Sequence, residues 1–526
     1  MTTSGFERVL PRLFRWRSQL SGPQHPVNSY VWRTAAGTVL IDPAADLKPA
    51  LFGQINAPPV IDILTTHVQE ENVAGCLNFP EARVHVPVGD EYLCDGPEAY
   101  RKCYTKWPDP WDWTTRGNYK GHLAGAFNER PSPEKISLAG SLREGTRDAG
   151  CEVFSTPGHG KNAVTLVAEI DGKRVAFCGD LICGEGQLWN WFDSDWDYGL
   201  QTGPKSLLKS AIRLRESKPD VLCATHGDVI TNPQHALGVL IQRLETVLRD
   251  SPQIHDKPIN FPEKDSPARG WREILPSLHQ WRDGNCNVLI SSTGNALLVD
   301  DGLCYWKPLP ERSRHHREVI QDLKRSLGIK RIEIVVPTHY HGDHTENIPE
   351  LVEMEGTQVV CVDLVAEVIE HPGRFNLASP LPWYDTAHDT VKVDRRVKSG
   401  ERIRWQEFEL ECFHLGGQTY YHSGLSVVVD GLRVLFVGDA FHTGGALVPP
   451  VLCYNKCEPE TQGWAYATDR MVEHKPDLLV CGHGSAMRDP MPTLKKQKQL
   501  WQQRIAEYRA LSARKDLRDF FDPFKS

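Results

Sequence analysis

Four potential metal ligands lie within six residues in the second half of the chain. His339, His341, Asp343 and His344 follow directly on the apolar segment 332–336, which we predict to be a buried strand. A single histidine after a strand is usually structural. Imidazole and carboxylate groups at this density instead suit a borderline divalent metal such as zinc. The spacing therefore predicts a metal site in a tight loop after a strand.

This run resembles the His-x-His-x-Asp-His signature of the metallo-β-lactamase superfamily. The resemblance implies an α/β (α+β) fold, the αββα sandwich of that family. It extends over Ser277–Met487, because later family ligands also recur in order. Asp439 follows the apolar segment 434–437, where the family has its bridging aspartate. His483 follows the apolar segment 478–481, where the family has its last histidine.

The resemblance also implies a role for each ligand. The first metal takes His339 and His341, the second takes Asp343, His344 and His483, and Asp439 bridges both. Two divalent ions about 3.5–4 Å apart can share a hydroxide of lowered pKa, which attacks a carbonyl or phosphoryl centre. Asp343 would hold that hydroxide and shuttle its proton, and His442 is either the acid for the leaving group or a bystander. We expect two Zn²⁺ ions, with iron or manganese as alternatives.

One position departs from the family pattern. The family has a Pro-Gly-His-Thr loop that supplies a third histidine to the first metal, whereas Gln418 stands at that place here. An amide oxygen can bind a metal but is a weaker donor than imidazole. We favour Gln418 as the ligand, and His422 or His414 remain alternatives. The substitution predicts a weaker first metal site or one with altered metal preference.

The chain repeats itself, as five pairs of similar segments in the same order show. The pairs are 5–16 with 270–281, 28–42 with 285–300, 63–67 with 335–339, 175–180 with 434–439, and 218–227 with 475–484. We predict two tandem copies of the family fold, at 1–252 and 270–526, joined by a linker at 253–269. The basic N-terminus is then the first element of a domain rather than a targeting leader.

The first copy has lost part of the signature. His67 survives, but Gln69, Glu71 and Asn72 replace a histidine, an aspartate and a second histidine. The copy keeps three later ligands, His159, Asp180 and His226. We favour a degenerate domain kept for its packing. A mononuclear site on His67, His159 and Asp180, with Gln69, is the alternative.

Composition narrows the class of protein. The chain has 526 residues with a net charge of −8, which disfavours a nucleic-acid or membrane-surface binder. It contains no apolar run near the ~18 residues that span a bilayer. Its 14 cysteines contain no Cys-x-x-Cys pair and are typical of reduced, buried thiols. We expect a cytoplasmic protein. Tryptophans in two insertions are expected to line a cleft or cover a domain interface. They are Trp107, Trp111, Trp113, Trp189, Trp191 and Trp196.

The leading hypothesis is a metal-dependent hydrolase of a small ester, thioester or lactone, similar to the glyoxalase-II-like branch of the family. The fold alone does not fix the substrate. One alternative is an iron-dependent oxidoreductase of the same fold, which the Gln418 substitution could signal. Another is a non-catalytic binding or scaffold protein with a vestigial metal site. The duplication also makes a pseudo-dimer within the chain plausible.

Overall fold

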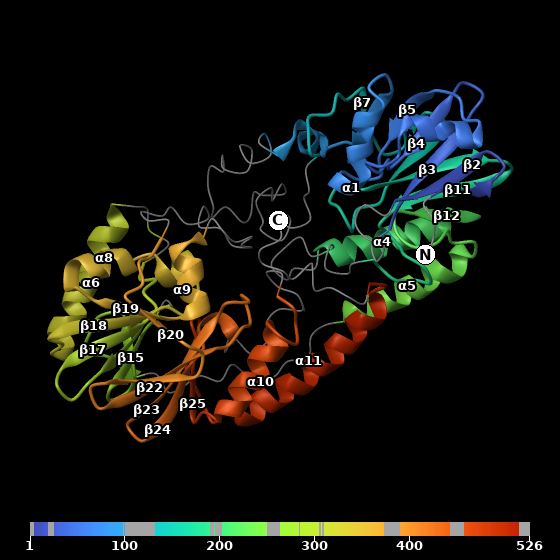
Figure 1. Ribbon diagram of the computed structural model, residues 1–526. Coiled ribbons are helices and arrows are strands. Elements are labelled where there is room, and N and C mark those ends of the chain that lie inside the picture. The colour runs from blue at the N-terminus through green and yellow to red at the C-terminus, as the bar shows by residue number, and fades with distance from the viewer. Residues whose placement is uncertain are drawn as a thin grey trace. The chain divides into compact units, whose positions relative to one another are not determined.

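The computed structural model divides the chain into two compact units. One contains Met1–Arg249 and Ala506–Asp516, and the other contains Asp250–Ile505 and Leu517–Ser526. The structure describes residues 5–18, 26–97, 99, 132–189, 194, 202–249, 264–282, 285–304, 307, 310–372, 390–441 and 457–514. Each unit is an αββα sandwich of two mixed sheets between helices, as predicted (Figure 1).

The first unit begins with a sheet of seven strands among its described residues. They are β1 (Phe6–Leu10), β2 (Leu13–Ser18), β3 (Val27–Arg33), β4 (Thr38–Ile41), β5 (Val60–Leu64), β6 (Arg83–Pro87) and β7 (Gly140–Leu142). The facing sheet contains β8 (Arg147–Asp148), β9 (Cys151–Ser155), β10 (Val164–Ile170), β11 (Lys173–Gly179) and β12 (Val221–Ala224). The basic N-terminal residues thus form β1 and β2, the first elements of a domain, as predicted.

Both faces of the first sheet are buried, because each packs against a different partner. Leu13, Tyr30 and Ile41 form one cluster with Leu166 and Phe177 of the second sheet. The opposite face packs against short helical segments. Those segments are η1 (Pro49–Ile55), α1 (Glu70–Val73), η2 (Ala74–Asn78) and η3 (Glu91–Asp95), and the later helices are α4 (Thr202–Glu216) and α5 (Pro233–Val247). Strands buried on both faces read as continuous apolar runs, which is the pattern of the sequence here.

The second unit repeats this arrangement with longer sheets. The first sheet contains β13 (Lys264–Asp265), β14 (Trp271–Leu275), β15 (Leu278–Trp281), β16 (Asn287–Ile290), β17 (Asn295–Val299), β18 (Arg331–Val336), β19 (Gln358–Val362) and β20 (Arg395–Val397). The second contains β21 (Glu401–Trp405), β22 (Phe408–His414), β23 (Ser423–Val429), β24 (Leu432–Phe436), β25 (Leu478–Val480) and β26 (Met487–Arg488). The strand β13 lies inside the segment predicted as linker, so the domain boundaries stay a prediction.

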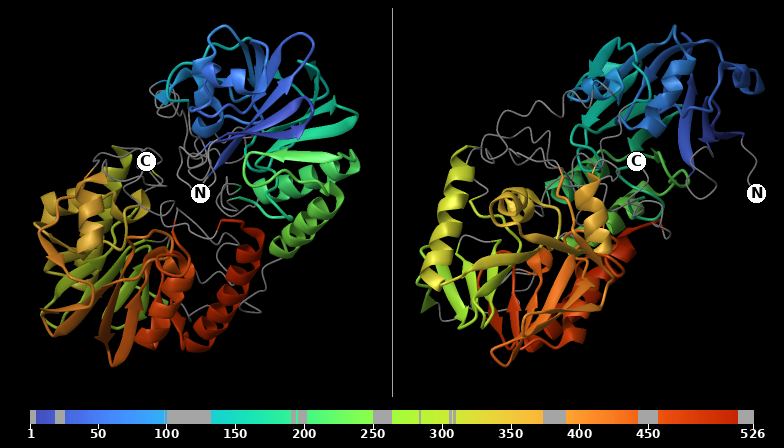
Figure 2. Two further views of the ribbon diagram at one scale, coloured as in Figure 1. Left: turned by 45° about the vertical axis from the view of Figure 1, so that its right-hand side comes forward. Right: turned by 60° about the vertical axis from the view of Figure 1, so that its left-hand side comes forward.

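Helices cover the outer faces of this second sandwich (Figure 2). They are α6 (Glu311–Leu327), α8 (Ile348–Glu355), α9 (Asp363–Glu370), α10 (Trp464–His474) and α11 (Met491–Leu511), of which the residues from Ala506 onward belong to the first unit. Two short helices, α7 (Gly342–Thr345) and η7 (Gly438–Ala440), lie instead at the edge where the strands end. Helix α10 packs on the second sheet through Ala467 and Met471, which join Phe413 and Leu435 in one buried cluster. In the described part of the chain, none of the helices has both the length and the apolar composition to cross a bilayer.

Strand direction explains why ligands distant in sequence meet. In the first sheet β17 and β18 are parallel neighbours, so Asp300 and the loop after Val336 emerge at the same edge. In the second sheet β24 and β25 are also parallel neighbours, so Asp439 and His483 emerge together. The carboxyl ends of adjacent parallel strands are the usual place for a site in such folds.

Candidate metal centres

Two groups of potential ligands gather at this edge of the second unit. One contains His339, His341 and Asp439, and the other contains Asp343, His344, Asp439 and His483. Within each group the ligand atoms lie within 4.8 Å of one another. The structure thus brings together six of the residues that the sequence singled out, and Asp439 belongs to both groups.

His339 and His341 lie side by side in the loop between β18 and α7. His339 Nε2 lies 2.9 Å from His341 Nδ1, and His339 Nδ1 lies 3.0 Å from the hydroxyl of Thr338. Burial, reinforced by neighbouring histidines, lowers the pKa of His339 well below its usual value. Burial also lowers the pKa of His341 to about 4. Both rings are therefore neutral at pH 7, which is the form that binds metal.

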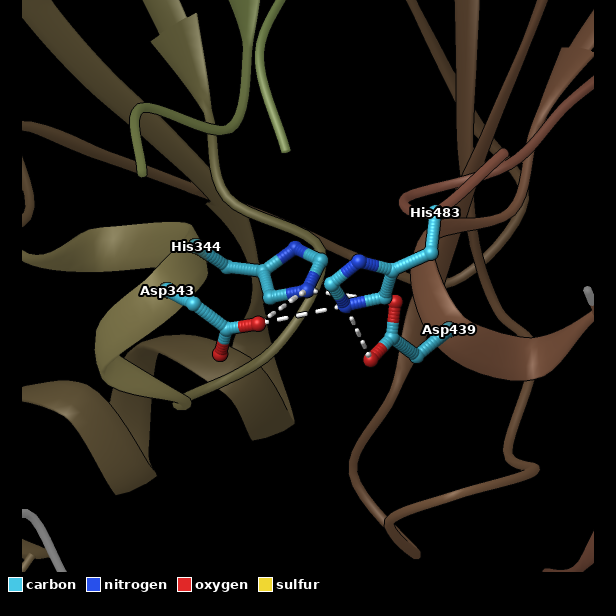
Figure 3. Close-up of side chains that lie close together, drawn as sticks. All are labelled: Asp343, His344, Asp439 and His483. Atoms are coloured by element: carbon cyan, nitrogen blue, oxygen red, sulfur yellow. Dashed lines mark ion pairs between the residues drawn. The ribbon is translucent and has the colours of Figure 1, made fainter. Parts of the chain in front are cut away.

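The second group is a compact set of carboxylates and imidazoles (Figure 3). His483 Nε2 lies 3.2 Å from Asp343 Oδ2 and 3.3 Å from Asp439 Oδ2, and His344 Nε2 lies 3.2 Å from Asp439 Oδ1. Burial disfavours the charged forms of these side chains, but the attraction between the carboxylates and the imidazoles outweighs this effect. This attraction lowers the pKa of Asp343 to about 2 and raises the pKa of His483 to about 10. A bound cation would supply the positive charge that these two carboxylates require.

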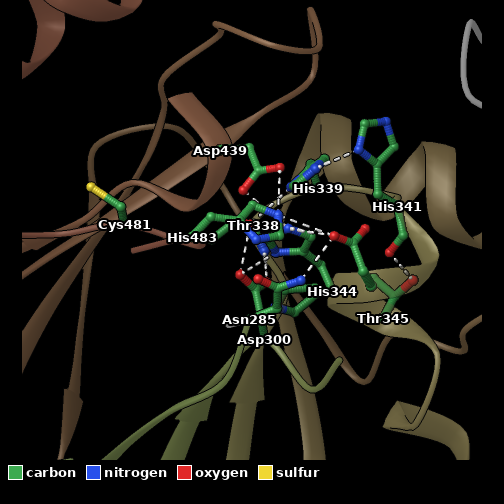
Figure 4. Close-up of polar contacts among 12 residues, drawn as sticks. Asn285, Asp300, Thr338, His339, His341, His344, Thr345, Asp439, Cys481 and His483 are labelled. Carbon is green, nitrogen blue, oxygen red and sulfur yellow. Dashed lines mark hydrogen bonds and ion pairs between the residues drawn. The ribbon is translucent and has the colours of Figure 1, made fainter. Parts of the chain in front are cut away.

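Residues behind the ligands fix their orientation (Figure 4). Asn285 donates its amide to Asp343 Oδ2 at 2.8 Å. Asp300 Oδ2 lies 2.8 Å from His344 Nδ1, and the same carboxylate accepts hydrogen bonds from the backbone and hydroxyl of Thr338. His344 Nδ1 therefore donates to Asp300 and leaves Nε2 directed at Asp439. This carboxylate–histidine arrangement is the one that orients metal-binding imidazoles.

The donor set fits a pair of divalent ions. It combines imidazoles with carboxylates, and Cys481, although close in sequence to His483, is not among the ligands of either group. The buried Nε2 atom of His341 has no hydrogen-bond partner among the described residues, which is costly unless a ligand occupies the position. Among nitrogen and oxygen ligands, zinc, iron and manganese are all compatible with this set.

The position of the missing third histidine is occupied by a buried glutamine. Gln418 lies in the loop between β22 and β23, and its backbone carbonyl accepts a weak hydrogen bond from Cys457 Sγ at 3.7 Å. Its role as a ligand stays a prediction. His422 stacks on His339 at 4.3 Å between ring centroids, but its Nε2 lies 3.1 Å from the Val437 carbonyl oxygen.

Both ring nitrogens of His414 contact groups other than the metal ligands. Its Nε2 lies 2.5 Å from the carbonyl oxygen of Tyr420, and its Nδ1 lies 3.3 Å from the hydroxyl of Tyr466. Neither His414 nor His422 joins a group of potential ligands among the described residues. The choice of Gln418 over the two histidines as the third ligand of the first metal stays a prediction.

The first unit also gathers ligands, although its signature is incomplete. His67, His159 and Asp180 form one group, and Glu71, Asp180 and His226 form another. The carboxylate of Asp180 is shared between them, as Asp439 is in the second unit.

Two residues that support the ligands are not predicted from the sequence. Asn285 and Asp300 stand at the ends of a repeated segment, and only the structure shows their contacts with Asp343 and His344. Their recurrence as Asn28 and Asp42 in the first copy was the available signal. His442, the candidate acid, lies outside the described residues.

The tryptophan insertions are described only in part. Trp107, Trp111, Trp113, Trp191 and Trp196 lie outside the described residues. Trp189 stacks on the ring of His226, with centroids 4.6 Å apart and an interplanar angle of 12°. This one tryptophan therefore lies beside a group of potential ligands.

Comparison with known proteins gives the family. The model of the metallo-beta-lactamase superfamily matches residues 22–226 and 279–500, which is more than half of the chain. The chain therefore belongs to the metallo-β-lactamase superfamily and contains two tandem copies of its fold, the first with a degenerate signature. A comparison with curated proteins gives no match.

Solved structures similar to one copy come from several bacteria. A metallo-β-lactamase from Cronobacter sakazakii is 15% identical, with a TM-score of 0.36, over 46% of this chain and 96% of that one. A subclass B3 metallo-β-lactamase of Bradyrhizobium japonicum is 19% identical, with a TM-score of 0.30, over 44% of this chain and 95% of that one. A metallo-β-lactamase family protein from Thermus thermophilus is 22% identical, with a TM-score of 0.32, over 46% of this chain and 83% of that one.

Proposed function

We propose that the second copy is a metal-dependent hydrolase of small esters, thioesters or lactones. The observation that carries the proposal is the sharing of Asp439 between two groups of ligands. A carboxylate that belongs to two ligand groups suits a site with two adjacent divalent ions better than a site with a single ion. When bound, two such ions, zinc in this proposal, polarise the attacked carbonyl and make water a nucleophile near neutral pH.

The residues of the chain supply orientation and a proton acceptor. Asn285 holds the Asp343 carboxylate by a hydrogen bond of 2.8 Å, so that this carboxylate has one defined direction. In our proposal Asp343 positions the attacking water and accepts its proton. Asp300 and Thr338 keep the imidazoles of His344 and His339 in place and do not contact the substrate.

Exposure indicates the direction from which a substrate arrives. The side chain of His483 is 32% exposed, whereas that of His344 is 0% exposed. Solvent therefore reaches the centre on the side of His483, and we propose that the substrate enters there. The net charge of −8 favours a small substrate over a polyanionic nucleic acid.

The proposal is tested by hydrolysis of an aryl ester, an acyl thioester and a γ-lactone by zinc-loaded protein. His341→Ala removes a ligand of the first ion and should lower kcat/KM by at least ~100-fold. The matched control is His235→Ala, an exposed histidine in α5 whose replacement should leave kcat/KM unchanged.

Three outcomes would contradict the proposal. Hydrolysis that His341→Ala leaves unchanged, or that the wild type does not perform on any of the three substrates, would favour a non-catalytic binding protein. Bound iron with consumption of oxygen would favour an oxidoreductase.

A further inference from the structure

The first copy brings three histidines and one glutamate together around Asp180. His67, His159 and His226 are all buried, and their Nε2 atoms all face Asp180 Oδ2. Glu71 approaches the same place from α1, with Oε1 3.5 Å from His226 Nε2. These residues lie in the copy whose signature predicted a degenerate domain.

The distances in this cluster are those of ligands that share an ion. His159 lies 3.5 Å from Asp180, and His67 and His226 each lie 3.7 Å from it. Hydrogen bonds between nitrogen and oxygen are shorter, at about 2.7–3.2 Å. Ligands bound to one tetrahedral zinc ion at about 2.0–2.2 Å lie roughly 3.3–3.5 Å from one another. The spacing is therefore wider than that of ordinary hydrogen bonds and close to that of shared coordination.

The tautomer of His226 directs a lone pair at the cluster. Its Nδ1 lies 3.1 Å from the carbonyl oxygen of Pro26, which can only accept a hydrogen bond. Nδ1 therefore carries the proton, and a neutral His226 presents an unprotonated Nε2 to Asp180 and Glu71. His67 is held similarly: the hydroxyl of Thr66 donates to Asp42 Oδ2, so its oxygen accepts a hydrogen bond from His67 Nδ1, 2.9 Å away. Hydrogen bonding of the second nitrogen in this way is typical of metal-binding histidines.

Two substitutions in the signature change the ligands offered to the second ion. In the second copy, His344 contacts Asp300 through Nδ1 and the centre through Nε2. Asn72, at the corresponding place, donates its amide to Asp42 and to the hydroxyl of Thr225, and it has no imidazole nitrogen to offer a metal. Asn72 keeps the hydrogen bond to Asp42 but does not replace the imidazole ligand that His344 provides in the second copy.

Glu71 keeps a carboxylate at the position of Asp343. It is one methylene longer than Asp343, its counterpart in the second copy, and its carboxylate reaches the neighbourhood of His226. Compared with the second copy, the group that contains Glu71, Asp180 and His226 has therefore lost one imidazole and kept its carboxylates.

We propose that the first copy holds a two-metal centre of its own, bridged by Asp180. One divalent ion is bound by His67 and His159, and the other by Glu71 and His226. The chain then binds four ions rather than two. Carboxylate and imidazole donors without thiolate suit zinc or a similar borderline ion. The proposal does not depend on hydrolysis by the second copy.

The experiment counts ions per chain. Full-length protein is stripped with a chelator, reloaded with Zn²⁺, passed through a desalting column and analysed by mass spectrometry for zinc. The first-copy variant carries His159→Ala with His226→Ala, the second-copy variant carries His341→Ala with His483→Ala, and His235→Ala is the control. Wild type and control should bind about four ions, and each double variant about two. Circular dichroism of the metal-free proteins checks that all are folded.

The outcomes separate the two centres. A first-copy variant that binds as much zinc as wild type would overturn the inference, even if the second-copy variant loses two ions. Loss of zinc in the first-copy variant alone would support it, even if the second copy proved inactive. If a double variant loses its circular dichroism signal, zinc binding by Glu71→Gln tests the inference instead.

Glu71→Gln preserves size and removes only the charge of one ligand. We expect titration with Zn²⁺ to show the weaker of the two first-copy ions bound at least about tenfold less tightly. Unchanged affinity for every ion in Glu71→Gln would contradict the assignment of Glu71, and with it the second ion of the first copy.

Discussion

Gly302 is the position where one added methyl group should damage the second-copy centre most directly. It follows Asp300 and Asp301 at the end of β17, and its N–H donates to the carbonyl of Asn285. A Cβ atom at Gly302 would lie 1.5 Å from the carbonyl oxygen and 2.2 Å from the carbonyl carbon of Asp343. The obstacle is backbone, so no change of rotamer can relieve the clash.

The size of the displacement follows from these distances. Real Cβ atoms essentially never approach other atoms more closely than 3.0 Å. In Gly302→Ala the peptide that joins Asp343 and His344 must therefore move by roughly 1.5 Å. Catalytic groups tolerate about 0.5 Å, and a 1 Å error can lower a rate about 100-fold. Overpacking of this kind also destabilises a fold by about 1–3 kcal/mol.

We expect Gly302→Ala to lose the ion held by Asp343 and His344 and to lower kcat/KM at least ~100-fold. Zinc analysis and the hydrolysis assay above measure both effects. The control is Gly238→Ala in α5, where the new Cβ meets only the Arg215 side chain at 3.7–3.9 Å. This helix substitution should stabilise the fold by about 0.5–1 kcal/mol and leave zinc content unchanged. Wild-type zinc content and kcat/KM in Gly302→Ala would refute the reasoning.

Three further predictions concern stability and metal binding. Although burial lowers the pKa of His316, Asp301 and Glu350 raise it to about 9. The protonated ring therefore stabilises the fold fully below pH 6.5, and the free energy of unfolding falls by up to about 3 kcal/mol as the pH rises through 9. Urea unfolding of His316→Gln should not show this fall. An equal fall in both proteins would contradict the assignment. Gln418→His should bind the first ion at least about tenfold more tightly in competition with a chelator, whereas unchanged affinity would exclude Gln418 as a ligand. Removal of metal should lower the Tm, because Asp343 and Asp439 lose their compensating charge, and zinc should restore it; a Tm indifferent to chelator would contradict bound metal.

Local signals were sufficient to predict the fold and the group of polar residues that gather at one edge of the second unit. The duplicated segments and the signature around His339 predicted two copies of one fold. Each ligand directly follows an apolar run, and parallel neighbours bring the ends of such runs to one edge. Asp439 and His483 could be placed for that reason, although each is far from His339 in the sequence.

Contacts between distant polar residues could not be predicted in this way. His316 lies in the charged segment of α6, where a solvated face is the ordinary interpretation, yet the structure buries it between Asp301 and Glu350. Nothing in the spacing of these residues indicates the pairing. Glu71 reads in the sequence as a replacement of the family's aspartate, and the approach of its carboxylate to His226 is visible only in three dimensions.

The central claim is that His339, His341, Asp343, His344, Asp439 and His483 hold two ions in the second copy. The most direct measurement is anomalous X-ray diffraction at the zinc absorption edge from crystals of zinc-loaded protein. We expect two peaks in the second copy, one beside His339 and His341 and one beside Asp343, His344 and His483, with Asp439 between them. A map without a peak among these residues, from protein shown to be zinc-loaded in solution, would contradict a two-metal centre here.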